Sequence, residues 1–292
     1  MASPKPVFRP AAPTEVETLL AVYDRHYRGG YSACFDRYGP PTPQDLWWVQ
    51  SEKAVTVIEV DRSLAGMLVL GRSGRRLLVE EILLDRLPDD TEGLLRQIHD
   101  WLTRRFQEER QETLALRCDE TNAPALTLVR TFGFTFADAL LVAALGGAAE
   151  GGESEMTPPA GYQVRRATPA DARQIGALYK EVMGEALGAA DLERLWRTPG
   201  TRVLLAERER FPVAFLLAQV REGTGRWIVG VREAHRRRGL GRALAHAAWR
   251  FFQTKRAHAI TTYWGTRVAT AAFIHALGCR IERAYLYFER PL

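Results

Sequence analysis

Apolar and polar positions follow two different periods along the second half of the chain. Runs rich in aliphatic and aromatic residues, which are typical of strands, occupy residues 201–209, 212–220, 226–231 and 258–264. Between the last two runs, apolar residues recur at helical spacing and predict a helix with one buried face. They are Leu240, Leu244, Ala247, Ala248 and Phe251.

The order of strand, loop, helix and strand predicts a parallel crossover in an otherwise mostly antiparallel sheet. The expected fold class is therefore α/β (α+β), with a mixed, mostly antiparallel sheet flanked by helices in each domain. The length of 292 residues suits two domains of about 140 residues each.

The two halves of the chain resemble each other, which predicts a tandem duplication. Residues 8–23 align without gaps on residues 164–179, and each segment predicts a short strand, a turn and a helix. Residues 128–142 align on 273–287, and each predicts a helix, a glycine stop and a strand. The offset between the halves falls from 156 to 145, so the first half carries 11 extra residues, which we place in 27–44.

A change of composition divides the chain near its middle. In residues 146–161, small, acidic and proline residues replace the periodic apolar positions, as in a linker. The predicted organisation is a first domain at 1–146, a linker at 147–160 and a second domain at 161–292.

The formal net charge of +5 permits an acidic partner, but most of the 40 basic residues are arginines spread along the chain. A nucleic-acid surface is expected to cluster on one face. Three widely spaced cysteines argue for a reducing compartment and against a disulfide framework or a cysteine-rich zinc site. No apolar run approaches the ~20 residues of a membrane span. We therefore expect a cytoplasmic protein with no nucleic-acid or membrane partner.

Residues 229–244 place three consecutive arginines and a Gly-Leu-Gly between a predicted strand and a predicted helix. The first N–H groups of a helix have no intrahelical partner, and the helix dipole is positive there, so an anion is stabilised. Gly239 and Gly241 lack Cβ atoms, which lets the backbone approach phosphate oxygens. The P-loop motif and the third glycine of a dinucleotide fingerprint are absent. A pyrophosphate site is favoured, with a solvated basic helix edge as the alternative.

These residues resemble the R/Q-x-x-G-x-G/A motif of the GNAT superfamily of acyl-CoA-dependent N-acetyltransferases. Arg236 takes the first position of the motif, Gly239 the middle glycine and Gly241 the last. The resemblance covers nearly the whole second half. The two-domain layout, the weak first domain and the Val-Gly-Val strand are similar to the tandem, mycothiol synthase-like members of the superfamily.

The resemblance implies that backbone amides from about Arg236 to Arg242 hold the pyrophosphate of acetyl-CoA or another acyl-CoA. It also implies that the strand 229–231 binds the pantetheine arm, with one amide polarising the thioester carbonyl. In the family this strand is splayed from the next parallel strand, here 259–264. The cofactor-binding residues so predicted are Val229, Gly230, Val231, Arg236, Arg237, Arg238, Gly239, Leu240, Gly241 and Arg242. No histidine spacing predicts a metal site.

The usual general acid of the family is missing from the second half. Many members carry a tyrosine four residues before the glycine of the final helix, where this chain has Ile274. The nearest alternatives by segment are Tyr263, Tyr285 and Tyr287. Water as the proton donor, or acyl-CoA binding without efficient transfer, are the other possibilities.

The identity of the general base is also undecided, because the strand 226–231 has no carboxylate. Glu207 ends a neighbouring strand and His235 precedes the arginine loop, so either is a candidate to deprotonate an ammonium through water. The alternatives are a solvated carboxylate at a strand end and a loop histidine that packs beside Arg236.

The first half departs from the family in a different way. Val129 occupies the tyrosine position, and Asp89, Asp90 and Glu92 stand where arginines are expected. Carboxylates repel a pyrophosphate, so this half is not expected to hold CoA in the ordinary way. Asp89, Asp90 or Thr91 is instead expected to cap the following helix.

Two features of the first half suggest an acceptor pocket for a cationic substrate. They are the consecutive Glu80 and Glu81 on a predicted strand, and the aromatic, glycine-rich insert from Tyr23 to Trp48. The alternative is that Trp47, Trp48 and Tyr31 only pack an interdomain surface.

We therefore expect an N-acyltransferase that moves an acyl group from acetyl-CoA, or another acyl-CoA, to a primary amine of a small-molecule acceptor. Transfer is expected to be direct, in a ternary complex, helped by proximity and electrostatic stabilisation. The alternative is a non-catalytic acyl-CoA-binding or scaffold protein that lost the general acid. The expected assembly is a monomer or a homodimer.

Overall fold

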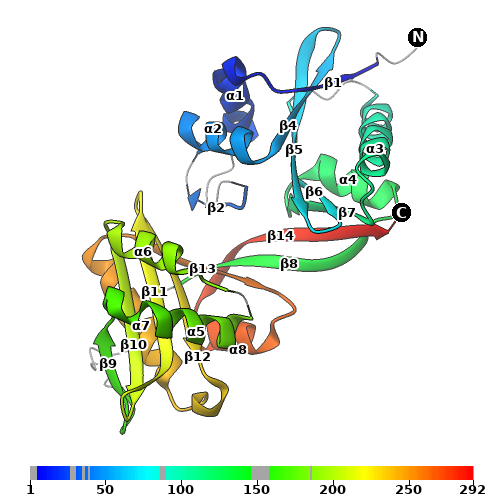
Figure 1. The fold of residues 1–292 in the computed structure, drawn as a ribbon. Helices are drawn as coiled ribbons and strands as arrows, with labels where there is room; N and C mark the ends of the chain where they lie inside the picture. The colour runs from blue at the N-terminus through cyan, green and yellow to red at the C-terminus, as the bar shows by residue number, and fades with distance from the viewer. Residues whose placement is uncertain are drawn as a thin grey trace. The chain divides into compact units, whose positions relative to one another are not determined.

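The computed structural model describes residues 5–26, 31–34, 37–38, 40–85, 90–145, 158–184 and 186–291. Contacts between residues divide the chain into two compact units (Figure 1). The first unit comprises Met1–Leu141, Trp264–Arg267 and Glu282–Leu292, and the second comprises Val142–Tyr263 and Val268–Ile281.

The first unit is a mixed sheet with helices on both faces. Its elements, in chain order, are β1 (Val7–Pro10), α1 (Val16–His26), β2 (Tyr31–Ser32), β3 (Arg37–Tyr38), α2 (Pro43–Glu52), β4 (Ala54–Val60), β5 (Ser63–Ser73), β6 (Arg76–Leu84), α3 (Thr91–Glu108), β7 (Thr113–Asp119), α4 (Ala123–Thr131), most of β8 (Thr135–Ala144) and most of β14 (Arg280–Pro291). The strand order is β1-β4-β5-β6-β7-β14, in which β6 and β7 are parallel and the other neighbours are antiparallel.

Alternation along the strands sends apolar side chains to both faces of this sheet. On β5, Met67 and Val69 join the core beneath α1 and α2, whereas Leu68 and Leu70 join the core beneath α3 and α4. Figure 1 shows the two helix pairs on opposite sides of β4, β5 and β6. The unit is therefore a three-layer structure with a core on each face.

The second unit repeats this plan. Its elements are β9 (Gln163–Arg166), α5 (Ala172–Met183), α6 (Ala189–Arg197), β10 (Thr201–Arg208), β11 (Phe211–Arg221), β12 (Thr224–Val231), α7 (Leu240–Thr254), β13 (His258–Trp264) and α8 (Val268–Ala276). The strand order is β9-β10-β11-β12-β13, with only the β12–β13 pair parallel. The predicted fold class, the predicted strands and the parallel crossover through α7 are confirmed.

Two glycines of β12 show that α5 and α7 cover opposite faces of this sheet. A Cβ atom on Gly225 would meet the ring of Phe252 on α7, and one on Gly230 would meet the ring of Phe215. Phe215 lies in the core that contains Ile175 of α5. Because residues an odd number apart point to opposite faces of a strand, the two helices lie on opposite sides of β12.

The predicted duplication is visible as one ion-pair network that occurs in both units. Arg9 on β1 donates to Glu15 at 2.6 and 2.8 Å and to Glu59 on β4 at 2.6 Å. Arg165 on β9 donates to Asp171 at 2.8 and 2.9 Å and to Glu207 on β10 at 2.7 Å. In each unit the acidic residue also accepts the backbone N–H three residues before it, which fixes the entry to the first helix.

The extra residues of the first half lie where they were predicted. Residues 27–42 separate α1 from α2, whereas residues 184–188 separate α5 from α6. Part of the longer segment lies outside the described residues. The first and second helices of the two units otherwise correspond.

The end strands depart from the predicted division of the chain. Strand β14 pairs antiparallel with β7, with Leu286 opposite Cys118 and Phe288 opposite Leu116, so Glu282–Leu292 belong to the first unit. Conversely, β8 passes into the second unit at Val142, and the N–H of Leu145 donates to Ala259 of β13 at 2.9 Å. The predicted assignment of 282–292 to the second domain is corrected, because strand pairing places them elsewhere. Most of the predicted linker, 147–157, lies outside the described residues.

No helix in the described part of the chain is long and apolar enough to cross a membrane.

Candidate functional site

The strands β12 and β13 separate at their carboxyl ends. They pair only over Thr224–Arg226 and His258–Ile260. Beyond this point the hydroxyl of Thr261, a residue that the sequence reasoning had not singled out, donates to the carbonyl of Trp227 at 3.2 Å. From there to the end of β12, the edge of the strand that faces away from β11 has no partner strand. This is the separation of strands that the family resemblance implied.

The open edge of β12 presents backbone groups of Val229 and Val231. The N–H of Arg232 donates to Val213 of β11 at 2.9 Å. Because successive N–H groups of a strand point to opposite edges, Val229 and Val231 direct theirs away from β11. The carbonyl of Val231 accepts the guanidinium Nε of Arg236 at 3.0 Å. The amides of Val229 and Val231 therefore remain as donors on the open side.

Gly230, predicted as a binding residue, has a packing role in the structure. A Cβ atom at this position would lie 2.2 Å from Cε1 of Phe215, which is fully buried. No side chain fits there without moving the core under α5. Its place on the binding strand stays a prediction, but packing alone explains why the residue is glycine.

The loop between β12 and α7 leaves a row of backbone amides without partners. The N–H of Arg236 donates to the carbonyl of Glu233 at 3.1 Å, and the first bond of α7 runs from Ala243 to Gly239 at 3.0 Å. Arg237 and Gly239 have φ angles of 62° and 86°, which turn the chain into the helix. No bond within the described part of the chain engages the N–H groups of residues 237–242.

The first amide of the predicted set is therefore corrected. Arg236 was expected to offer its N–H to a phosphate, but that group closes a turn onto Glu233, and its side chain bonds Val231. The side chains of Arg237, Arg238 and Arg242 are exposed and form no ion pair with described residues. Leu240 is buried, so it contributes its backbone N–H to the site and its side chain to the core.

Gly239 and Gly241 have different reasons to be glycine. Gly239 adopts a left-handed conformation, and a Cβ atom would meet only Pro159 at 3.5 Å. At Gly241 a Cβ atom would lie 3.1 Å from the Phe273 ring on α8, so the glycine permits close packing of two helices. Backbone conformation makes Gly239 the more sensitive position of the loop.

The three candidate tyrosines fall in different units. Tyr263 lies on β13 in the second unit, beyond the residues that pair with β12, and burial followed by the nearby Cys279 raises the pKa of its hydroxyl. Tyr285 and Tyr287 belong to the first unit, where they pair with β7. Of the three, only Tyr263 shares a unit with the arginine loop. Ile274 is buried.

The two candidate bases have structural partners. Glu207 is held by Arg165 at 2.7 Å and corresponds to Glu59 of the first unit, so its position is explained by the duplicated network. Nδ1 of His235 lies 3.0 Å from the hydroxyl of Tyr162. Burial and then the arginines at 238, 208 and 232 lower the pKa of His235, which favours its neutral form. His235 packs on Tyr162 instead of beside Arg236.

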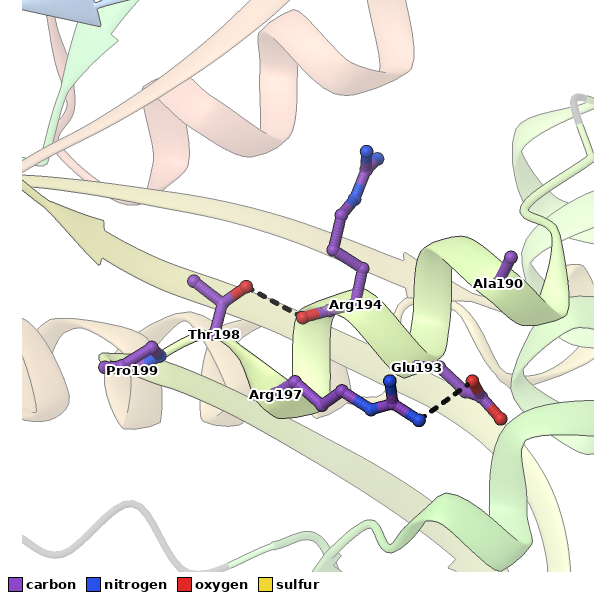
Figure 2. Close-up of a pocket in the computed structure, with 6 residues that line it drawn as sticks. All are labelled: Ala190, Glu193, Arg194, Arg197, Thr198 and Pro199. Atoms are coloured by element: carbon purple, nitrogen blue, oxygen red, sulfur yellow. Dashed lines mark hydrogen bonds and ion pairs between the residues drawn. The ribbon is translucent and has the colours of Figure 1, made fainter.

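A surface pocket of about 360 Å³ lies elsewhere in the second unit, at α6 (Figure 2). The pocket is lined by Ala190, Glu193, Arg194, Arg197, Thr198 and Pro199. Arg197 reaches Glu193 at 3.5 Å, and the hydroxyl of Thr198 donates to the carbonyl of Arg194 at 2.7 Å. Helix α6 packs on α5 and β10, not on β12. We assign this pocket no part of the candidate site.

The corresponding loop of the first unit is built differently. The carboxylate of Asp90 accepts the N–H of Gly93 at 2.8 Å and caps α3, as predicted. Glu92 pairs with Arg96 at 3.4 Å, and Asp89 lies outside the described residues. A carboxylate therefore accepts the N–H of Gly93 at the start of α3, whereas in the second unit no described residue engages the amides at the start of α7.

The side chains of Trp47 and Trp48 are exposed by 62% and 48%, and their packing at an interdomain surface stays a prediction. The side chain of Tyr31 lies outside the described set. Glu80 is buried and carries two ion pairs, with Lys53 and Arg117. Among the described residues, no three His, Cys, Asp or Glu side chains gather as a metal-binding group.

The sequence of residues 172–278 matches the acetyltransferase (GNAT) family. No curated protein sequence matches the chain significantly. The fold is similar to that of a GCN5-related N-acetyltransferase from Sphaerobacter thermophilus, with 16% identity, a TM-score of 0.76, and coverage of 98% of this chain and 96% of that one.

Two further solved structures share the fold over the same span. A tandem GNAT protein from the clavulanic acid biosynthesis pathway is 16% identical, with a TM-score of 0.72 and coverage of 98% of both chains. A GNAT-family acetyltransferase from Colwellia psychrerythraea is 10% identical, with a TM-score of 0.68 and coverage of 98% of this chain and 99% of that one. The fold shared with these proteins spans both units.

Proposed function

We propose, from the match of residues 172–278 to the acetyltransferase (GNAT) family, that the second unit binds an acyl-CoA and transfers its acyl group to a primary amine. The fold supports acyl-CoA-dependent acyl transfer in general. The loop that would hold the cofactor, the amine as acceptor and direct transfer in a ternary complex are our proposals.

The observation that carries the proposal is the row of unengaged amides at residues 237–242, at the start of α7. Consecutive N–H groups at a helix N-terminus, together with the helix dipole, form a site for a phosphate. Arg237, Arg238 and Arg242 place exposed positive charges around it. A pyrophosphate carries the charge and the number of acceptor oxygens that such a loop satisfies.

The open edge of β12 lies at the other end of the same loop. We propose that the amides of Val229 and Val231 donate to carbonyl groups of the pantetheine arm and of the thioester. An N–H aimed at the thioester oxygen stabilises the negative charge that develops when the amine attacks. Holding both reactants along this edge lowers the entropic part of the barrier.

Proton transfer is assigned by elimination among the predicted candidates. Tyr263 is the candidate that shares the second unit with the loop, and its raised pKa keeps the hydroxyl protonated, as a proton donor requires. His235, kept neutral by burial and neighbouring arginines, retains the capacity to accept a proton through water. Glu207 is held by Arg165, so it is the least suited of the candidates.

The proposal is tested by calorimetric titration of CoA into the Gly239→Val variant. Valine does not tolerate a φ of 86°, so the turn must change and the amides must move. Losing two or more charge-assisted bonds predicts that CoA affinity falls by at least about 100-fold.

The matched control is Gly184→Val. Gly184 has a φ of 82° with nothing within 4 Å of its Cβ position, so the variant carries similar strain in the same unit without touching the loop. It is expected to keep the affinity of the original chain. Unchanged CoA affinity in a folded Gly239→Val protein would refute the proposed cofactor site.

A second function is favoured by one observation: the buried Ile274 occupies the position where many family members carry the acid. On this alternative the protein binds acyl-CoA without transferring the acyl group. Release of free thiol from acetyl-CoA, measured with a panel of primary amines, separates the two functions. Binding without thiol release supports the alternative, and amine-dependent release supports the enzyme.

A further inference from the structure

The first unit contains a second pair of separated strands. Strands β6 and β7 are parallel neighbours only over Arg76–Val79 and Thr113–Leu116. A bulge follows at once, because Val69 of β5 lies opposite Glu81 while Leu70 lies opposite Val79. Glu80 and Glu81 therefore stand just beyond the last paired residues of β6.

Glu80 is fully engaged in holding this region together. Its Oε2 atom accepts Nζ of Lys53 at 2.6 Å and a guanidinium N–H of Arg117 at 2.9 Å. Its other oxygen lies over Gly71, where a Cβ atom would be only 2.3 Å away. Glu80 is buried, and these contacts account for it as a structural residue.

Glu81 has no such partner. Its carboxylate forms no hydrogen bond or ion pair with any described residue, although its neighbours come from several elements, and the side chain stays partly exposed. The carboxylate affects Cys34 and, on β14, Tyr285: burial first, and then Glu81, raises the pKa of the Cys34 thiol to about 12 and raises the pKa of the Tyr285 hydroxyl. Tyr23 of α1 donates to Sγ of Cys34 at 3.8 Å.

The charged side chains around Glu81 are paired with one another, and none of the described residues pairs with Glu81. Lys53 and Arg117 share Glu80, and Arg283 pairs with Asp119 at 3.2 Å. Each of these groups has a partner of opposite sign. Among the described charged residues of the cluster, Glu81 alone lacks one. Burial raises its pKa to about 7, with Arg117 acting in the opposite direction.

We infer that Glu81 is the counter-ion of a second ligand site, in the first unit, which binds a small molecule that carries a protonated primary amine. An ammonium group brings one positive charge and three N–H donors to a carboxylate that has no partner among the described residues. A partly desolvated environment strengthens this attraction relative to that in water. Burial and then the charge of Glu81 raise the pKa of the Tyr285 hydroxyl, and an aromatic ring near a carboxylate is favourable to a cation.

This site does not depend on the proposed cofactor loop. In the first unit the carboxylate of Asp90 caps α3 by accepting the N–H of Gly93, and a carboxylate at that place repels a pyrophosphate. Binding at Glu81 requires only residues of the first unit.

The test is calorimetric titration of n-butylammonium chloride into the full chain at about pH 8, where Glu81 is ionised and the amine protonated. Saturable binding is expected with the original chain, at least about 10-fold weaker binding with Glu81→Gln, and no comparable binding of the uncharged isostere 1-butanol. Binding is also expected to weaken at about pH 5.5, because protonation of Glu81 removes the counter-ion.

Two variants control the experiment. Glu92→Gln removes an exposed carboxylate of the same unit and is expected to bind as the original chain does. Gly239→Val, aimed at the cofactor loop, is expected to retain butylammonium binding, which separates this inference from the proposed function. Equal affinity in Glu81→Gln, equal affinity for 1-butanol, or no saturable binding to the original chain would each overturn the inference.

Discussion

Gly230 and Gly241 show that a motif residue can be required for packing as well as for binding. The sequence places both in a predicted cofactor site, and the structure places Phe215 and Phe273 where their Cβ atoms would lie. Glu80 and Glu81 show the converse, since two identical neighbours have different roles: Glu80 holds two cations, and Glu81 pairs with none of the described residues. At this scale, chemistry follows from the partners and not from the residue type.

Glu81 gives a prediction about stability and pH. Its pKa is about 7 in the folded protein and 4.5 ordinarily, so the folded state binds the proton more tightly. Below about pH 4.5 this proton contributes its full stabilisation, and the free energy of unfolding falls by about 3 kcal/mol as pH rises to about 7. In Glu81→Gln this decrease in the free energy of unfolding is expected to be absent. Urea unfolding at about pH 5 and about pH 8 measures the decrease in both proteins.

Glu92→Gln supplies the comparison for this measurement, because Glu92 is exposed and pairs only with the neighbouring Arg96. It is expected to keep the pH dependence of the original chain. An equal loss of stability with rising pH in the Glu81→Gln and Glu92→Gln proteins would show that Glu81 is hydrated in the folded state.

At the scale of elements, the strand, turn and helix that open each unit form a repeated module. Arg9 and Arg165 each tie the first strand to the turn and to the second strand. Hydrogen bonds from these arginines hold the pKa of Glu15 at about 2 and that of Asp171 below its usual range. The network explains why two aligned arginines and two aligned acids persist in halves that otherwise differ.

Replacing Arg165 by methionine is expected to lower the free energy of unfolding by about 1–2 kcal/mol, because Asp171 and Glu207 lose charge-assisted bonds. A depressed carboxylate pKa stabilises the fold above its ordinary pKa of 3.8, and this contribution is lost as pH falls below that value. The variant should therefore lose less stability on acidification than the original chain. Urea unfolding at about pH 7 and about pH 3 tests both expectations.

Arg9→Met is the matching substitution in the first unit, and a loss of similar size is expected there. Arg210→Met removes an arginine that lies at an exposed turn and is expected to change stability little. If Arg165→Met and Arg210→Met had the same effect, the module would contribute nothing beyond surface charge.

Local sequence patterns were sufficient for α7 and the strands beside it, for the strand, turn and helix that open each half, and for the position of the insert. The helix at Leu240, for example, follows from apolar spacing and the preceding glycine, which act within a few residues. The loop between β12 and α7 was also predicted from residues that are close in the sequence. The hydrogen bond from the N–H of Arg236 to Glu233 was not predicted, because it depends on a turn that residue spacing does not reveal. The environment of Glu81 was beyond prediction, since it combines α1, β6, β7 and β14, which are far apart in the sequence.

The pairing of the end strands belongs to the scale of the whole molecule. The alignment of residues 273–287 with 128–142 predicts a strand after Gly278, but it does not specify the partner strand, because pairing depends on contacts distant in sequence. In the structure β14 completes the sheet of the first unit beside β7. The C-terminal residues of the chain are thus needed by the unit formed mainly from its N-terminal half.

This arrangement predicts that Phe288→Ala weakens the first unit. Phe288 lies opposite Leu116 and packs on the core beneath α3 and α4. Removing a partly buried ring is expected to lower the free energy of unfolding by about 2 kcal/mol. Hydrogen exchange of the full chain should show faster exchange along β7 and unchanged exchange along β12.

Phe211→Ala, at a ring that is 70% exposed, is the control and should alter exchange in neither strand. Faster exchange in β12 but not in β7 would mean that β14 supports the second unit, as the linear order of the chain first suggests.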